Sequence, residues 1–363
     1  MRKLILLLVL ACLLSTSVYA EDLLSQQAEA YGANELEREI PNEVKNLLNE
    51  TKDDTGTRFI AVLRNLFAAA IKNGESAMEI TVKNMLRILC IATLCRIMSC
   101  VDLPHMEIAV SVTGTIGVTL CCVSDLRNLI GLGLSSMNEL VSFSGILMPV
   151  MAAAAAGSGS VNSAIAIQSI AVFFFHLLIR LCNSVLLPLV YAGLGMSVVD
   201  SVLQSNKLKG FRDLINWMIK TGLKYMTYAF SGIVSLSGLV AGTADAAAVK
   251  AAKSAISMAV PVVGSMVSGA ADTILSNAAW LKSSIGIYGV LALLGIFLFP
   301  FIKMGISYLS FRLTTAVCAV VESKLSSILE AVSQSMGYLM AMTATGLLMG
   351  LLSCFCLMRT GQP

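Results

Sequence analysis

Charged residues are scarce in this chain of 363 residues, because Asp, Glu, Lys and Arg together make up only 13% of it. A soluble domain carries about 25% charged residues, so this deficit argues against an ordinary soluble protein. Apolar residues make up 56% of the chain, and the mean hydropathy is +0.81. The formal net charge of +3 is too small and too scattered for nucleic-acid binding. The composition therefore predicts a membrane protein.

Residues that carry catalysis are also rare. The chain has two histidines, His105 and His176, and no metal-binding spacing of the HExxH or CxxC kind. It has neither a GxxxxGK[ST] loop that would cradle nucleotide phosphates nor a GxSxG nucleophile motif. The sequence therefore predicts no enzyme, no cofactor and no metal site.

The ten cysteines do not form a disulfide framework. Segment 21–85 is the one polar region of the chain and contains no cysteine, although exported domains are where disulfides are expected. Most of the cysteines lie in apolar stretches, which predicts small buried residues.

The first twenty residues have the three parts of a signal peptide. Arg2 and Lys3 form a charged start, residues 4–14 form an apolar core, and small residues lead to a cleavage site at Ala20. The core is too short for a stable membrane anchor. We predict a signal peptide over 1–20 and a mature N-terminus outside the cell membrane, with an uncleaved first anchor as the alternative.

Segment 21–85 is predicted to be exported and helical. It holds twelve acidic and seven basic residues, so the exported face is acidic. Apolar residues recur in it at helical spacing from Phe59 to Phe67, which predicts an amphipathic helix. Such a helix lies on the outer membrane surface or belongs to a small soluble hairpin, and the sequence leaves both open.

The remainder, 86–363, is predicted to be an all-α polytopic membrane domain with about eight spans. Between Leu140 and Ile179 there is no charged residue, so two helices must fit there, with a turn at 157–160. The eight predicted spans are 86–101, 106–123, 140–157, 163–179, 182–199, 225–243, 284–302 and 336–357.

The charge of one loop predicts the orientation. Loop 200–224 carries five basic residues against two acidic ones, and the positive-inside rule places it in the cytoplasm. Five crossings from an outside N-terminus lead to the same side. The loop 303–335 is then also cytoplasmic, provided that 254–271 dips into the membrane and returns.

Segment 254–271 is an irregular apolar stretch. Pro261 and Gly264 weaken a helix, and Asp272 is a costly carboxylate if it lies in lipid. Non-helical backbone at membrane depth survives only inside protein or beside water, which predicts a re-entrant or broken segment. The alternative is that proline and glycine only kink a helix and that Asp272 caps one. The candidate pathway or gating residues are Pro149, Lys250, Lys253, Pro261, Gly264, Asp272 and Lys282.

An internal repeat is a further hypothesis. Pro149 and Pro261 are separated by 112 residues, and Pro188 and Pro300 by the same interval. Transport folds often contain two related halves. The halves here would be 106–199 and 218–311.

Residues 249–290 resemble the signature region of the stage III sporulation protein AE family of endospore-forming bacteria. They read VKAAKSAISMAVPVVGSMVSGAADTILSNAAWLKSSIGIYGV. The order of a signal peptide, a polar exported segment and a multi-span region also fits that family.

The resemblance implies a setting for the protein. Family members act in the mother-cell membrane around the engulfed forespore, as part of a channel or secretion-like assembly. The implied partners are other stage III sporulation proteins, among them a cytoplasmic secretion-type ATPase and ring-forming intermembrane proteins. The family brings no catalytic residues, and the number of copies, a homo-oligomer included, stays open.

The expected function is therefore the permease-like membrane core of this channel. Two alternatives are a stand-alone secondary transporter of a small solute and a non-conducting membrane scaffold for the ring proteins. The small number of intramembrane ionisable residues available for coupling counts against the transporter.

Overall fold

The computed structural model describes residues 55–99, 106–203, 208–259, 264–321 and 323–360. Their regular structure is entirely helical, which confirms the predicted all-α class. The predicted signal peptide with Ala20, residues 21–54 and Pro261 lie outside the described residues. The elements are α4 (Thr55–Ser99), α5 (Met106–Gly157), α6 (Val161–Leu181), the π-helix η1 (Cys182–Leu186), α7 (Leu187–Leu203), α8 (Lys209–Ala259), α9 (Gly264–Val321) and α10 (Ser323–Arg359).

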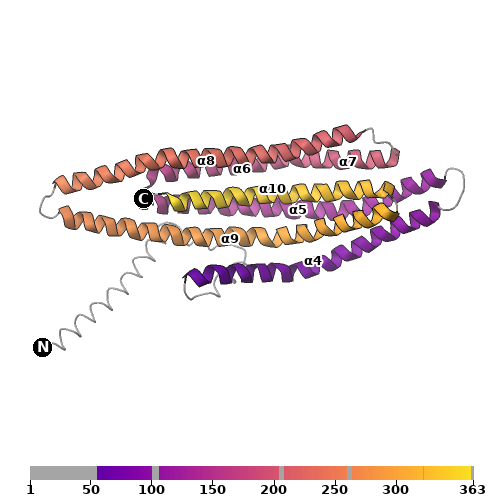
Figure 1. The fold of residues 1–363 in the computed structure, drawn as a ribbon, viewed down its shortest axis with the longest axis horizontal. Coiled ribbons are helices and arrows are strands. Elements are labelled where there is room, and N and C mark those ends of the chain that lie inside the picture. Colours follow the sequence, from indigo (N-terminus) through magenta and orange to yellow (C-terminus); the bar gives the residue numbers. More distant parts are fainter. Residues whose placement is uncertain (1–54, 100–105, 204–207, 260–263, 322, 361–363) are drawn as a thin grey trace, which may run out of the picture.

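These helices form an elongated bundle in which successive long rods run in alternating directions (Figure 1). The longest, α9, has 58 residues, which is about 87 Å at 1.5 Å per residue. Helix α10 is central and packs against α5, α6, α7, α8 and α9, whereas α4 packs on α9 and α5.

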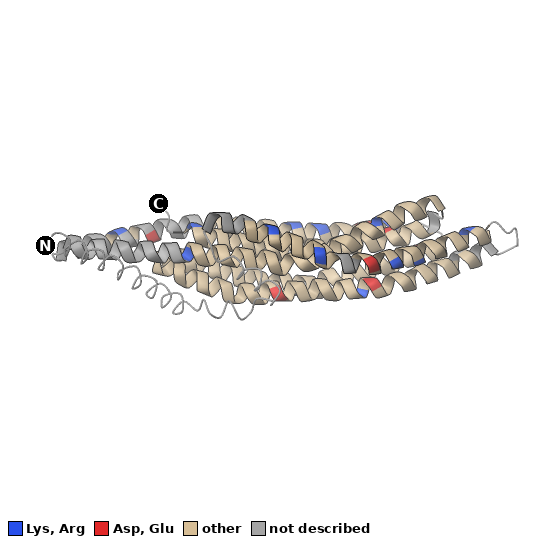
Figure 2. Ribbon diagram, turned by 90° about the horizontal axis from the view of Figure 1, so that it is seen from below, with Lys and Arg blue, Asp and Glu red and all other residues tan. Residues whose placement is uncertain are grey.

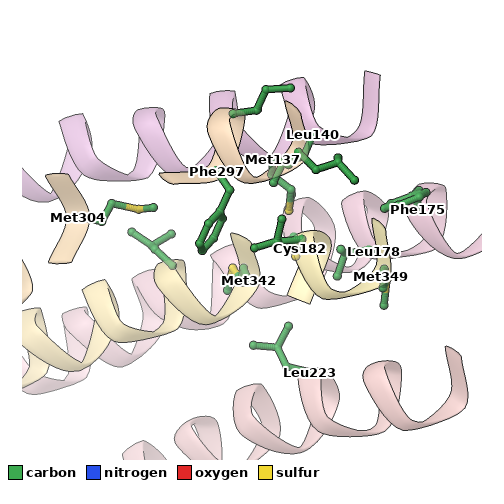
Figure 3. Packing of buried hydrophobic residues seen from close by; sticks show 14 of the residues in the cluster. Met137, Leu140, Phe175, Leu178, Cys182, Leu223, Phe297, Met304, Met342 and Met349 are labelled. Carbon is green, nitrogen blue, oxygen red and sulfur yellow. The ribbon is translucent and has the colours of Figure 1, made fainter. Parts of the chain in front are cut away.

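The interior of the described bundle is filled by apolar side chains. Met137 and Leu140 of α5 lie near Cys182 and Met342, in a layer that the neighbouring helices complete (Figure 3). Interiors of this kind are as densely packed as organic crystals. The close-packed core fixes how the long helices lie against one another.

Four described helical stretches are long and apolar enough to cross a membrane, by length and composition. They are Val112–Gly157, Val161–Val202, Lys282–Val321 and Leu325–Arg359. This supports a membrane protein, but the predicted eight spans are not confirmed. The predicted spans 106–123 and 140–157 are parts of one helix, α5, and 163–179 and 182–199 belong to one run from α6 to α7.

The run from α6 to α7 continues because a π-helix accommodates Pro188. A proline in a helix lacks an N–H and clashes with the carbonyl four residues earlier. Here the N–H of Leu187 donates to the carbonyl of Cys182, which gives the wider turn that single π-turns insert into α-helices. Helix α5 likewise continues through Pro149, one of the candidate gating residues.

The predicted turn at 157–160 is confirmed. Helix α5 ends at Gly157 and α6 begins at Val161. The Ser160 N–H donates to Ala155 O at 3.0 Å, and the Gly159 N–H donates to Ala156 O at 2.9 Å. This is the Schellman pattern, and it requires the positive φ of 91° at Gly159, which glycine adopts without steric cost.

Five helices share a stretch without Asp, Glu, Lys or Arg, which we call the charge-free belt. The stretches are 140–157 of α5, 161–179 of α6, 225–244 of α8, 283–302 of α9 and 331–358 of α10. The first four have 18 to 20 residues, or about 27–30 Å, which matches the roughly 30 Å of a bilayer's hydrocarbon core. Figure 2 shows how thinly charge is spread over the bundle as a whole.

Contacts between the helices place these stretches at one level. The rings of Phe174 in α6 and Phe230 in α8 lie 5.3 Å apart. Gly286 of α9 faces Met358 of α10 and Met151 of α5. The charge-free belt is therefore a continuous slab of the bundle and marks the part that fits the membrane interior.

One close contact inside the charge-free belt leads to a stability prediction. A Cβ added to Gly289 would lie 2.6 and 2.8 Å from the δ carbons of Leu147, which is fully buried. We therefore expect Gly289→Ala to lower the free energy of unfolding by about 1–3 kcal/mol through overpacking. Thermal unfolding in detergent measures this. Gly145→Ala is the control, because a Cβ there meets nothing within 4 Å, and an equal effect of both changes would contradict the prediction.

Candidate functional site at the base of the α8–α9 hairpin

The segment with the family signature, 249–290, forms the end of a long helical hairpin. Helix α8 ends at Ala259 and α9 begins at Gly264. Both helices extend past the C-terminal end of α10 (Figure 1). The helix breakers noted in the sequence therefore coincide with a reversal between two long helices. That reversal lies at the end of the bundle (Figure 1). The predicted dip of 254–271 into the membrane stays a prediction.

Two polar contacts at the base of this hairpin tie it to the bundle. Asp245 lies on α8, 14 residues before the helix ends, and Lys282 lies on α9, 18 residues after the helix begins. At 1.5 Å per residue the hairpin thus extends about 21–27 Å beyond them. We call these two residues and their partners the hairpin base.

The Asp245 carboxylate caps the N-terminus of α6. Its two oxygens accept the backbone N–H groups of Asn162 and Ser163, each at 2.9 Å. The first N–H groups of a helix have no partner within it, and Ser160 makes no side-chain cap of its own. A side chain 83 residues away in sequence therefore supplies the cap.

The environment of Asp245 favours its charged form. The residue is 5% exposed. Burial alone raises the pKa of the carboxyl, but the hydrogen bonds from Ser163 and Asn162 outweigh it, so the pKa lies below its ordinary value. The positive end of the α6 dipole acts in the same direction.

Lys282 is buried at the other side of the hairpin base, with only 1% of its surface exposed. Its ammonium group donates to the carbonyl of Thr360, just past the end of α10. No carboxylate forms an ion pair with it among the described residues. Burying an ammonium group without a counter-charge costs free energy, and few lysines in folded proteins are buried in this way.

The residues predicted to form a pathway are brought to the same end of the bundle, but they do not converge on one point. Lys250 is exposed on α8, and Pro149 is exposed on α5. Lys253 lies in the last turns of α8, whereas Gly264 and Asp272 lie in the first turns of α9. Their roles in a pathway stay predictions.

Sequence reasoning identified Lys282 but missed Asp245 and the groups that bind it. One signal was available, because Asp245 is the one acidic residue between Asp213 and Asp272. An isolated carboxylate at the end of an apolar stretch is a marker of function or of a specific contact. Its partners, the backbone N–H groups of α6, carry no signal in the sequence.

A second polar site lies between α7, α8 and α10. The Tyr338 hydroxyl donates to the side-chain carbonyl of Asn216 at 2.8 Å, and the Asn216 amide donates to Gln334 at 3.3 Å. These three side chains line a pocket to which Arg212 also contributes. It lies near the start of α8 and of α10, at the end opposite to the hairpin reversal (Figure 1).

Neither site holds a constellation typical of catalysis. Within the ranges that the structure covers, no three His, Cys, Asp or Glu residues are grouped so that they could hold a metal ion. The eight cysteines described are free thiols. The arrangement offers helix capping and a buried cation, which are means of holding helices together.

Comparison with known proteins gives two matches and one negative result. The family model described as stage III sporulation protein AE matches residues 42–361. A protein of Bacillus subtilis (strain 168) named Stage III sporulation protein AE is 26% identical over 228 residues, which is 62% of this chain. The aligned region spans only 57% of that relative's length. No solved structure matches this chain.

Proposed function

Because the chain belongs to the stage III sporulation protein AE family, we propose that it is the permease-like membrane core of the complex that links mother cell and forespore. In this role it is needed for forespore development after engulfment. The observation that carries the proposal is the family match over 42–361, which takes in all four candidate membrane helices. The match also reaches into segment 21–85, which the sequence predicts to be exported and helical.

The two ends of the bundle suit different partners in this proposal. The last residues of α7 and α9 lie at one end, and the last residues of α8 lie at the other (Figure 1). The first end carries Lys209, Arg212 and Arg312, which the positive-inside rule would place in the cytoplasm. There it would receive a secretion-type ATPase. The hairpin would then face the intermembrane space and the ring-forming proteins.

The described interior bears on where a path would run. It is filled with apolar side chains from α5 to α10, so we propose that a path runs along the outside of this bundle, between subunits. The same filled interior favours a second candidate function, a membrane scaffold for the ring proteins that conducts nothing. Water-accessible thiols at membrane depth would favour the conducting path over the scaffold.

Deletion in the native endospore-forming host tests the proposed function. We expect forespores to form and engulf, then to stall with reduced late forespore gene expression and a reduced spore yield. The full chain supplied in trans is the control and should restore the yield. Normal spores together with a defect in vegetative uptake of a solute would contradict the proposal and favour the transporter.

A further inference from the structure

Helix α4 differs from the helices of the charge-free belt although it runs beside them. It packs on α9 and α5, and its residues Val62, Leu66 and Ala70 are at most 2% exposed. Gly74 of α4 faces Ile302 and Ile306 of α9. Ile302 is the last residue of the charge-free belt on α9, so Gly74 marks the same edge on α4.

The two helices run in the same direction (Figure 1). The residues of α4 before Gly74, which the sequence assigns to the exported segment 21–85, therefore lie beside the charge-free belt, at its depth. Arg64 comes ten residues before Gly74, which is about 15 Å from the edge. That is close to the middle of a slab roughly 30 Å thick. An arginine there is too far from either edge to reach water by snorkelling.

The outward face of α4 at this depth carries positive charge. Arg64 and Lys72 are exposed there, with Phe67, Ala68 and Ile71 beside them. Residues 61–74 contain no Asp or Glu. Within the described structure Arg64 has neither an ion pair nor a hydrogen bond. Charged side chains at membrane depth almost always face protein or a water-filled cavity, so lipid does not suit this face.

We propose that the outward face of α4, centred on Arg64 and Ala68, lines an aqueous path at membrane depth that attracts anionic solutes. This inference rests on the proposed function, because a path is needed only if the protein conducts. It places that path outside the packed core. The other side of the path is formed by the subunit next to α4, and the experiment does not depend on the identity of that subunit.

Thiol labelling in membranes from sporulating cells tests the proposal with the full chain. Ala68→Cys lies one turn after Arg64 on the same face. Its matched control is Ile233→Cys, which is 45% exposed in the middle of the charge-free belt on α8. The chain with its native cysteines gives the background. The reagents are an anionic and a cationic membrane-impermeant methanethiosulfonate, with a permeant maleimide to verify that both thiols are reactive.

We expect the anionic reagent to label Ala68→Cys about tenfold faster than Ile233→Cys, since a cation-lined cleft concentrates anions. Adding Arg64→Glu should reverse the preference toward the cationic reagent. Equal, slow labelling of both positions by the impermeant reagents would overturn the proposal. Fast labelling that ignores the charge at residue 64 would also overturn it. Either failure leaves the sporulation phenotype of the deletion unchanged, so it can be told apart from a failure of the proposed function.

Discussion

Replacing Asp245 with alanine is expected to lower the free energy of unfolding by about 2–3 kcal/mol. The change removes a helix cap and leaves two backbone N–H groups, those of Asn162 and Ser163, without their charged acceptor. Because Asp245 joins α8 to α6, the loss should fall on the attachment of the hairpin to the bundle. Thermal unfolding of the full chain in detergent measures the difference.

The pH dependence of this effect has a definite sign. The pKa of Asp245 is lowered in the folded protein. The contribution of this carboxylate to the free energy of unfolding is therefore fully present above the ordinary carboxyl pKa of about 4. It is lost as the pH falls through the lower folded pKa. The difference in the free energy of unfolding between wild type and Asp245→Ala should therefore have its full size at neutral pH and shrink in strong acid. A gap that grows as the pH falls would contradict the capping role.

The second large effect is expected at Lys282. Replacing it with glutamate puts a carboxylate against the Thr360 carbonyl in a site that is 1% exposed. An uncompensated buried charge costs about 3–5 kcal/mol. Replacing Lys282 with methionine keeps most of the volume and removes the charge, so it should be close to neutral or stabilising. The unfolding midpoints of both variants test this contrast.

Lys303→Glu is the matched control for Lys282→Glu. Lys303 is exposed on the same helix, at the far edge of the charge-free belt, and surface substitutions usually change stability by less than about 0.5 kcal/mol. If both glutamate variants were equally stable, Lys282 would not be buried as described. A methionine variant as unstable as the glutamate variant would show that the ammonium itself holds the hairpin base together.

Local signals in the sequence were sufficient for two of the chain reversals. The glycine and serine residues of 157–160 predicted a turn that is present, because glycine alone adopts the positive φ at Gly159 without cost. Likewise, α8 ends two residues before Pro261, as expected since the residue preceding a proline disfavours helix. Each of these depends on neighbours in the chain.

The number and length of the helices could not be read in the same way. The sequence predicts a loop over 303–335, but Lys303 and Arg312 are exposed positions on α9, which continues to Val321. A charge on the outer face does not end a helix. The sequence predicts a separate span over 182–199, which contains Pro188, but the π-turn before this proline keeps the helix continuous. Whether such a turn forms depends on tertiary packing, which cannot be inferred from the neighbouring residues in the sequence.

The candidate site was only partly predictable for a related reason. The charge of Lys282 made it a candidate in the sequence. Its hydrogen-bond acceptor, the carbonyl of Thr360, lies 78 residues away along the chain and could not be identified from the sequence. The capping role of Asp245 depends on the approach of α6 to α8, which no local pattern specifies. The internal repeat of 106–199 and 218–311 stays a prediction.

The central position of α10 has a consequence for how the chain is made. Helices α5 to α9 pack against α10, yet all of them leave the ribosome before it does. Roughly two hundred residues separate the first residue of α5 from the first residue of α10, which is about 10 to 40 seconds of synthesis at 5–20 residues per second. During that interval the faces destined for α10 have no partner. The cell must shield them with lipid or an insertion factor until the centre of the bundle arrives.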